Sequence, residues 1–266
     1  MANSDAGSFL NLIHVISWWR GCVPPGFLGE SILKKNARYL VVCAVLAMAF
    51  ATIPSLRIQA QGHAPALDTI LKQLDANAST FHSLSADVAR TKVTVVVNDR
   101  STESGKLLVS GDKMLLQLTN PDQRTILRSG DDIYIYTPGL KRVEEYSLGK
   151  NRDLADEFLL LGFGTSGTQL QNGFQVKVLG EDTLSGEKTT ELELTPKSAS
   201  VLNQISKIQI WLDEATWLPV QQQFFETGSG DYFIVQYSKM IRNPHISESE
   251  FKPHWPKGTQ IMKPQG

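Results

Sequence analysis

The glycine-rich segment at residues 162–167 is the first stretch whose residue types and spacing match a known chemical site. It reads Gly-Phe-Gly-Thr-Ser-Gly and fits the G-x-G-x-x-G pattern of a dinucleotide-binding loop. That loop follows a strand and opens a helix, because the helix N-terminus must face the pyrophosphate. Here an apparent helix precedes the glycines, and no βαβ unit surrounds them. We therefore expect a mobile glycine-rich connection in place of a nucleotide site.

An enzyme active site would need an activated nucleophile, a bound metal ion or a pair of catalytic carboxylic acids. No serine lies in a G-x-S-x-G pattern. The acids cluster in turn-like pairs at 131–132, 181–182 and 213–214. The histidines after residue 60 are scattered, without the i, i+4 pair typical of a helical metal site: His63, His82, His245 and His254. We expect no enzyme, no metal site and no cofactor. A hydrolase whose carboxylates are brought together by the fold is the alternative.

Length and charge set the broad class. The chain has 266 residues, of which 41% are hydrophobic and 20% are charged, with a formal net charge of −1. These values are typical of a globular protein, and the length suits one large β-rich domain. Because no basic excess is present, we expect no nucleic-acid partner.

The N-terminal region predicts export. Lys34, Lys35 and Arg38 precede an apolar run at residues 39–53, and small residues lead up to Ala60. A basic flank, a short apolar run and a small residue before the cleavage point are the parts of a secretory signal. We expect cleavage near Ala60 and a periplasmic product. An uncleaved inner-membrane anchor is the alternative, although a spanning helix needs about 20 apolar residues.

This interpretation divides the chain into three parts. Residues 1–36 form an N-terminal extension, either a product of a start site placed too far upstream or a short interfacial helix. Residues 37–60 form the signal, and residues 64–266 form a single domain. Both cysteines, Cys22 and Cys43, precede the cleavage point. The exported domain would therefore carry no thiol, disulfide or cysteine metal site.

The apolar pattern changes from helical to alternating near Phe81. Leu67, Ile70, Leu71, Leu74 and Ala78 follow the spacing of one helical stripe. From residue 84 the period is two, and clusters of Gly, Pro, Asp and Ser separate short runs. We expect an antiparallel meander at 105–138, a second helix at 151–161, and strands at 84–97, 141–147, 175–179, 188–195, 204–212, 218–225 and 232–238. Pro219 must begin a strand or lie at an edge or a bulge.

Aliphatic residues are in excess on strands that should be half exposed. Nearly all positions from 107 to 118 that are not in the turn are apolar, and so are most positions from 126 to 136. One explanation is that helices bury one alternating set and that edges or loops cover the other. The other explanation is a sheet curved around an apolar ligand cavity, in which Met114 adds adaptable contacts.

The order of several short motifs resembles the outer-membrane lipoprotein carrier family, of the LolA type. The resemblance covers residues 66–262. It is carried by Phe81-His82-Ser83 before a strand, Thr119-Asn120-Pro121-Asp122, the run 129–138 (SGDDIYIYTP), Leu194-Thr195-Pro196-Lys197, Phe251-Lys252-Pro253 and Pro256-Lys257-Gly258. Each motif is short, but their order and spacing are hard to reproduce by chance.

The resemblance implies an α+β fold, mainly β: a strongly curved, incomplete antiparallel β-barrel with helices covering the concave apolar face. It implies a monomeric periplasmic carrier whose partners are acylated lipoproteins, an inner-membrane release complex and an outer-membrane acceptor. The ligand would lie in an apolar cavity lined by Leu107, Val109, Met114, Leu116, Leu118, Ile126, Ile133 and Ile135. A lid that the glycines allow to move would carry Phe158, Leu159, Leu160 and Phe163.

The turn at residues 111–113 departs from the family pattern. Relatives commonly have a basic residue and a proline there, and the basic residue helps to latch the lid. This chain has Gly111-Asp112-Lys113, so no latch is assigned, and Lys113 is a candidate only. A periplasmic sensor or regulatory domain of the same fold, which binds lipids or lipoproteins, is the functional alternative.

Overall fold

The computed structural model describes residues 66–149 and 158–264. The predicted extension at 1–36, the predicted signal at 37–60, both cysteines and residues 151–157 of the predicted second helix lie outside these ranges. Within them, no helix has the length and apolar character needed to cross a membrane.

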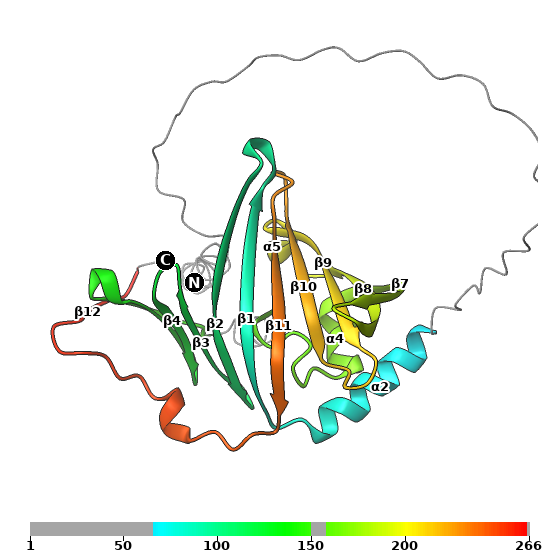
Figure 1. The fold of residues 1–266 in the computed structure, drawn as a ribbon, viewed down its shortest axis with the longest axis horizontal. Helices are drawn as coiled ribbons and strands as arrows, with labels where there is room; N and C mark the ends of the chain where they lie inside the picture. The colour runs from blue at the N-terminus through cyan, green and yellow to red at the C-terminus, as the bar shows by residue number, and fades with distance from the viewer. Residues whose placement is uncertain (1–65, 150–157, 265–266) are drawn as a thin grey trace, which may run out of the picture. The chain divides into compact units, whose positions relative to one another are not determined.

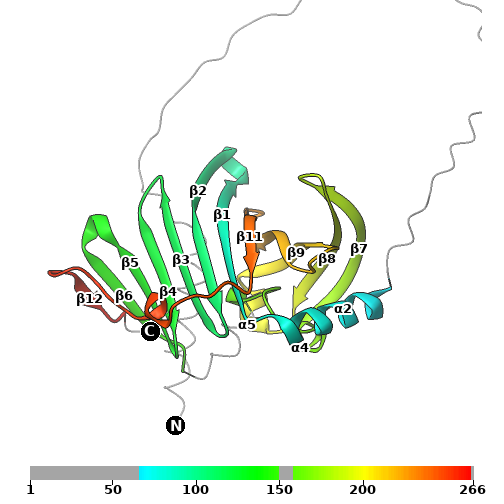
Figure 2. The same cartoon turned by 60° about the horizontal axis from the view of Figure 1, so that its bottom comes forward.

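One curved sheet of twelve strands forms the body of the described chain, and it stays open at both edges (Figures 1 and 2). The strand order is β12-β6-β5-β4-β3-β2-β1-β11-β10-β9-β8-β7. Neighbouring strands are antiparallel, except that β12 pairs with β6 in parallel. The bounds are β1 Ser83–Thr94, β2 Asp99–Ser110, β3 Lys113–Asn120, β4 Arg124–Ser129, β5 Asp132–Thr137, β6 Arg142–Ser147, β7 Phe174–Leu184, β8 Glu187–Pro196, β9 Ile205–Asp213, β10 Pro219–Glu226, β11 Tyr232–Arg242 and β12 Gln260–Met262. The prediction of a mainly β fold with an incomplete, strongly curved antiparallel sheet is confirmed.

The helices lie over the β7–β11 half of this sheet (Figure 2). They are α2 (Leu67–Thr80), α4 (Gly167–Gly173) and α5 (Ala199–Leu202). Helix α2 buries Ile70, Leu71 and Leu74, as its apolar stripe predicts. Asn77 takes the place expected of Ala78, and its side-chain amide donates to the carbonyl of Trp217 at 3.3 Å.

Four predicted element ends are wrong. The predicted strand at 232–238 extends as β11 to Arg242. Strand β1 ends at Thr94, because Val95–Val97 form a 3-10 turn followed by Asn98 in the left-handed conformation. The predicted short strand at 175–179 extends as β7 to Leu184, past a bulge after Val178. The predicted second helix stops before Leu160, where a turn begins. In contrast, Pro219 opens β10 beside a register shift, as its missing N–H requires.

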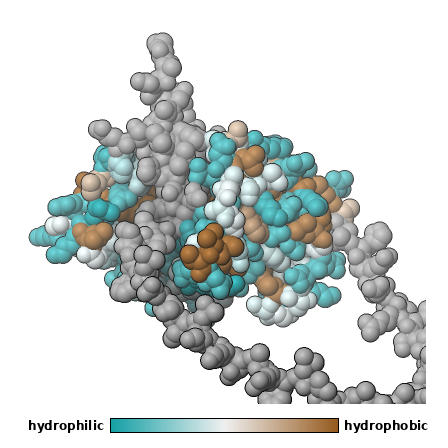
Figure 3. Space-filling model, turned by 90° about the horizontal axis from the view of Figure 1, so that it is seen from above, coloured by the Kyte–Doolittle hydropathy of each residue, from teal (hydrophilic) through white to brown (hydrophobic). Residues whose placement is uncertain are grey.

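The β1–β2 turn exposes its apolar side chains. Val95, Val96 and Val97 are 50%, 85% and 69% exposed. They form an apolar patch among hydrophilic residues when the molecule is viewed from above (Figure 3). A sequence pattern cannot separate such a turn from a strand, because valine suits both a buried strand and this tip.

A small second cluster explains part of the aliphatic excess. Leu115 and Leu127 face away from the main core and pack against Phe251, which belongs to the 3-10 helix η4 (Glu248–Phe251). Trp255 covers the neighbouring Tyr134 and Tyr136 rings at 6.0 and 5.2 Å between centroids. The C-terminal segment thus covers the outer side of strands β3–β5, as the first explanation of the excess predicts.

Candidate functional site

The eight residues predicted to line a cavity share one face of strands β2–β5. Strand register places them in adjoining rows, since residues directly opposite each other in neighbouring strands share a face. One row runs Val109, Met114, Arg128, Ile133, and the next runs Leu107, Leu116, Ile126, Ile135. Leu118 lies in a third row, opposite Gly105. We call these eight residues the apolar floor: Leu107, Val109, Met114, Leu116, Leu118, Ile126, Ile133 and Ile135. Each is at most 4% exposed.

Arg128 is a charged residue within the first of these rows. It is fully buried, with Met114 and Ile133 directly across on the neighbouring strands. Sequence reasoning missed it, although its spacing from Ile126 already places it on the same face. On β6 the row continues with Tyr146, whose hydroxyl donates to Glu144 at 2.8 Å. Polar groups therefore border the floor on its β6 side.

A partly buried charged cluster ends the floor toward the β1–β2 turn. Glu103 accepts from Arg90 at 2.9 Å and from Arg124 at 3.1 Å, and Lys92 pairs with Glu226 at 3.3 Å. The guanidinium of Arg90 also lies 5.0 Å from the centre of the Phe233 ring. Burial lowers the pKa of Arg90, and the charge of Glu103 opposes that shift. We call these five residues, Arg90, Lys92, Glu103, Arg124 and Glu226, the charged cluster.

Segment 158–165 packs against the neighbouring half of the sheet. The amide of Gln222 donates to the carbonyl of Leu161 at 2.8 Å, and the Tyr237 hydroxyl donates to Gln222 at 2.8 Å. Burial raises the pKa of Tyr237, so this hydroxyl keeps its proton. The Phe163 ring meets Tyr237 edge-on at 4.9 Å, and Phe158 meets Phe174 at 5.5 Å. The lid role of the four predicted residues stays a prediction.

The glycines of this segment have a packing reason that the sequence did not reveal. Gly164 has a φ of +78°, and a Cβ there would lie 2.7 Å from the Phe81 ring. A Cβ on Gly167 would lie 2.6 Å from the carbonyl oxygen of Leu71, at the contact of α2 with α4. Backbone conformation and close approach thus require glycine here, whereas the sequence interpretation assigned these residues only to mobility.

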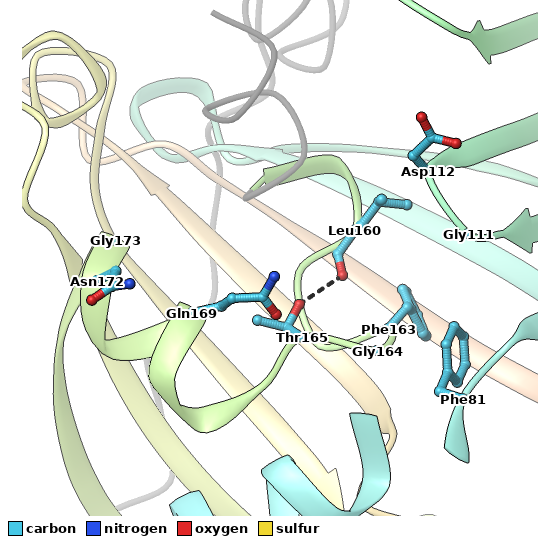
Figure 4. A pocket seen from close by; sticks show the side chains of 10 residues that line it. All are labelled: Phe81, Gly111, Asp112, Leu160, Phe163, Gly164, Thr165, Gln169, Asn172 and Gly173. Atoms are coloured by element: carbon cyan, nitrogen blue, oxygen red, sulfur yellow. Dashed lines mark hydrogen bonds between the residues drawn. The ribbon is translucent and has the colours of Figure 1, made fainter. Parts of the chain in front are cut away.

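A cavity of about 680 Å³ lies where the β2–β3 turn, the end of α2, the glycine-rich segment and α4 meet (Figure 4). Its volume falls within the roughly 300–1,000 Å³ common for ligand pockets. Two predicted lid residues line it, and the floor residues do not. The lining residues are Phe81, Gly111, Asp112, Leu160, Phe163, Gly164, Thr165, Gln169, Asn172 and Gly173.

The turn that departs from the family pattern contributes two of these lining residues. Its third residue, Lys113, forms an ion pair with Glu248 of η4. Its ammonium group is therefore engaged with the C-terminal segment, which covers the outer side of the sheet. This contact gives no support to Lys113 as a latch for segment 158–165.

Nothing in the described ranges forms a metal centre: no group of three or more His, Cys, Asp or Glu side chains there is placed to hold an ion. At least one of the acidic residues predicted to lie in a turn stabilises that turn by accepting backbone hydrogen bonds. Asp213 accepts from the backbone N–H groups of Ala215 and Thr216 at 3.2 and 3.1 Å. This is the turn chemistry that the pattern predicts.

The chain is similar to several known proteins in sequence and to solved structures in fold. A family model described as "-like: Uncharacterized protein" matches residues 110–243, about half of the chain. An outer-membrane lipoprotein carrier protein of Cupriavidus necator is 27% identical over 235 residues, covering 86% of this chain and 99% of the relative. A second, from Cupriavidus taiwanensis, is 25% identical over the same length. An uncharacterized conserved protein from Thermus thermophilus has a similar fold, with a TM-score of 0.50, 10% identity, and coverage of 74% of this chain and 98% of that one.

Proposed function

We propose, from the similarity to outer-membrane lipoprotein carrier proteins over 86% of the chain, that this protein is a periplasmic, non-enzymatic carrier of the LolA type. It holds the acyl chains of lipoproteins against the apolar floor and passes them toward the outer membrane. The observation that carries this proposal is the floor itself: eight apolar side chains in adjoining rows, with Arg128 within the first row, on one face of an open, curved sheet.

The energetics suit a lipid cargo. Each acyl CH₂ removed from water contributes about 0.8 kcal/mol, so a chain laid along the floor gains affinity with every methylene it buries. The charged cluster sets one end of this path, because an acyl chain cannot pass among paired charges without separating them. We place the cargo between the floor and segment 158–165.

On this proposal, release of the cargo requires segment 158–165 to move away from strands β10 and β11, against which it packs. The bonds from Gln222 to Leu161 and from Tyr237 to Gln222 hold the segment to β10 and β11. These contacts are neutral hydrogen bonds, each worth about 1 kcal/mol net. On this proposal a partner in the membrane shifts the segment at modest cost.

Larger side chains on the floor test where the lipid lies. Leu116→Phe and Ile126→Phe are expected to weaken binding of a fluorescent fatty acyl probe by at least about tenfold, because each ring fills space meant for the chain. The free energy of unfolding should change little. The measurements are probe titration and urea denaturation of the same preparations.

The neighbouring residue Leu115 provides the matched control. It lies on the opposite face, in the cluster with Leu127 and Phe251. Leu115→Phe overfills that cluster and should lower the free energy of unfolding by about 1–3 kcal/mol, with probe binding unchanged. If Leu116→Phe instead behaves like Leu115→Phe, the floor is ordinary core and the proposal fails.

Transfer toward the outer membrane is tested in cells. Depletion of the protein should leave acylated lipoproteins in the inner-membrane fraction, as followed by fractionation and immunoblotting. Acyl material should also appear by mass spectrometry in protein purified without detergent. Normal lipoprotein localisation, together with a stable complex with another periplasmic protein, would favour the sensor alternative.

A further inference from the structure

The cavity at the β2–β3 turn adjoins the floor but differs from it in chemistry. Val109 and Met114, both floor residues, stand two positions on either side of Gly111 and Asp112. The backbone N–H of Gly111 donates to the carbonyl of His82 at 3.2 Å, which ties the turn to the end of α2. A chain lying on the floor therefore has this cavity at its end nearest the turn.

The lining of the cavity is part apolar and part polar. Phe81, Leu160 and Phe163 provide the apolar part. Asp112 lies at one end and Asn172 at the other, with Gln169 between them (Figure 4). A fatty acyl chain alone would not use these polar groups, and the carboxylate of Asp112 would repel a free fatty acid head.

Two side-chain amides face this cavity with hydrogen-bonding capacity to spare. The Oε1 atom of Gln169 accepts from the backbone N–H of Ser166 at 2.9 Å, as part of the capping box of α4. Both residues are exposed, and among the described residues no protein group bonds to the NH₂ group of Gln169 or to the amide of Asn172, so water can be exchanged there for a ligand. An amide offers both a donor and an acceptor, which is what an extended polypeptide backbone presents in return.

We infer that this cavity is the subsite for the polypeptide segment next to the acylated end of the cargo. The inference rests on the proposed function and adds to it the part of the cargo that the floor does not explain. Phe81, Leu160 and Phe163 contact the apolar part nearest the acyl chains, and Gln169 and Asn172 bind backbone groups. Asp112 favours a cationic side chain or amine in that segment over an anionic one.

Two probes distinguish binding at the proposed subsite from binding at the floor. One probe is a fluorescent diacylglyceryl-cysteinyl hexapeptide, and the other is a fluorescent fatty acyl probe without peptide. Gln169→Glu keeps the Oε1 acceptor of the capping box but removes the NH₂ donor and adds a negative charge. It should weaken binding of the lipopeptide about three- to tenfold, the effect of one hydrogen bond, and leave the acyl probe unchanged.

The matched control is Gln171→Glu, which makes the same change at a position of α4 that is exposed like Gln169 but does not line the cavity. It should alter neither affinity. If Gln169→Glu and Asn172→Ala both bind lipopeptide as wild type does, while the acyl probe binds normally, the inference is wrong and the proposed function survives. If wild-type protein binds neither probe, the proposed function itself fails.

A charge exchange tests Asp112 directly. Wild-type protein should prefer a lipopeptide with lysine after the acylated cysteine over one with aspartate at that place, and Asp112→Asn should abolish the preference. Fatty acyl probe binding and the unfolding midpoint report whether that variant is folded. Equal affinity of wild-type protein for the two lipopeptides would remove Asp112 from the subsite.

Discussion

Replacing Glu103 by glutamine is expected to lower the free energy of unfolding by about 3 kcal/mol, as seen when one partner of a buried ion pair is removed. The carboxylate of Glu103 bridges Arg90 and Arg124, whose side chains are 7% and 19% exposed. Without it, the two guanidinium groups lose the carboxylate that they share in a partly buried region. Chemical denaturation, analysed by linear extrapolation, measures the change.

An ion pair whose cation reaches water is the control for this prediction. Glu193 is about as exposed as Glu103, at 21% against 19%, but its partner Lys207, 2.7 Å away, is 37% exposed, whereas Arg90 is 7% exposed. Glu193→Gln should cost less than about 1 kcal/mol. Replacing Glu103, Arg90 and Arg124 together by Leu, Met and Met should recover much of the stability, since apolar groups of similar size replace the charges. Equal effects of Glu103→Gln and Glu193→Gln would contradict the buried-cluster interpretation.

The floor was predictable because its strands are local. In a strand, residues two apart share a face, so the Leu107 and Val109 pair and the Leu116 and Leu118 pair were fixed by alternation. Short turns with clear chemistry join β2 to β5, and they set the register that aligns Leu107 with Leu116. The eight positions therefore fell on one face as expected. The alternation did not predict what covers the opposite face of the sheet. There, Leu115 and Leu127 are covered by the C-terminal segment.

The charged cluster and the cavity were not predictable, because each joins residues far apart in the sequence. Lys92 contacts Glu226 of β10 because β1 pairs with β11 and β11 pairs with β10, and no turn motif predicts the first of these pairings. The cavity likewise needs the end of α2, the β2–β3 turn and α4 to converge. The glycine-rich segment was misinterpreted for the same reason. Closely spaced glycines in a sequence suggest a flexible backbone, and only the packing of Phe81 on Gly164 shows that a larger side chain would not fit there.

The strand register determines how close the charged cluster lies to the apolar floor. Val88, Gly105 and Leu118 form the third row, and Arg90 with Glu103 forms the next. One strand step of two residues, about 7 Å, therefore separates apolar from ionic chemistry on the same face. Strand pairing sets this boundary between the apolar and the ionic rows. Any change that shifts β2 against β3 therefore moves the boundary and also misaligns the floor residues.

Gly105→Ala should be such a change and should cost more than about 4 kcal/mol, which is exceptional for a single substitution. A Cβ at this position would lie 1.9 Å from the backbone carbonyl oxygen of Gln117 and 2.7 Å from the Cα of Leu118. Backbone atoms cannot move aside as a flexible side chain can. Strands β2 and β3 would have to separate at the bulge between Ser104 and Gly105.

Gly139→Ala is the control, because a Cβ there meets no atom within 4 Å and the backbone does not require glycine. It should leave the free energy of unfolding within about 0.5 kcal/mol of wild type. Circular dichroism and urea denaturation measure both variants, and the fatty acyl probe reports the floor. Because register is lost only when β2 and β3 part, Gly105→Ala should lose probe binding together with stability. A stable, fully binding Gly105→Ala protein would mean that the close approach of β2 and β3 is not what aligns the floor.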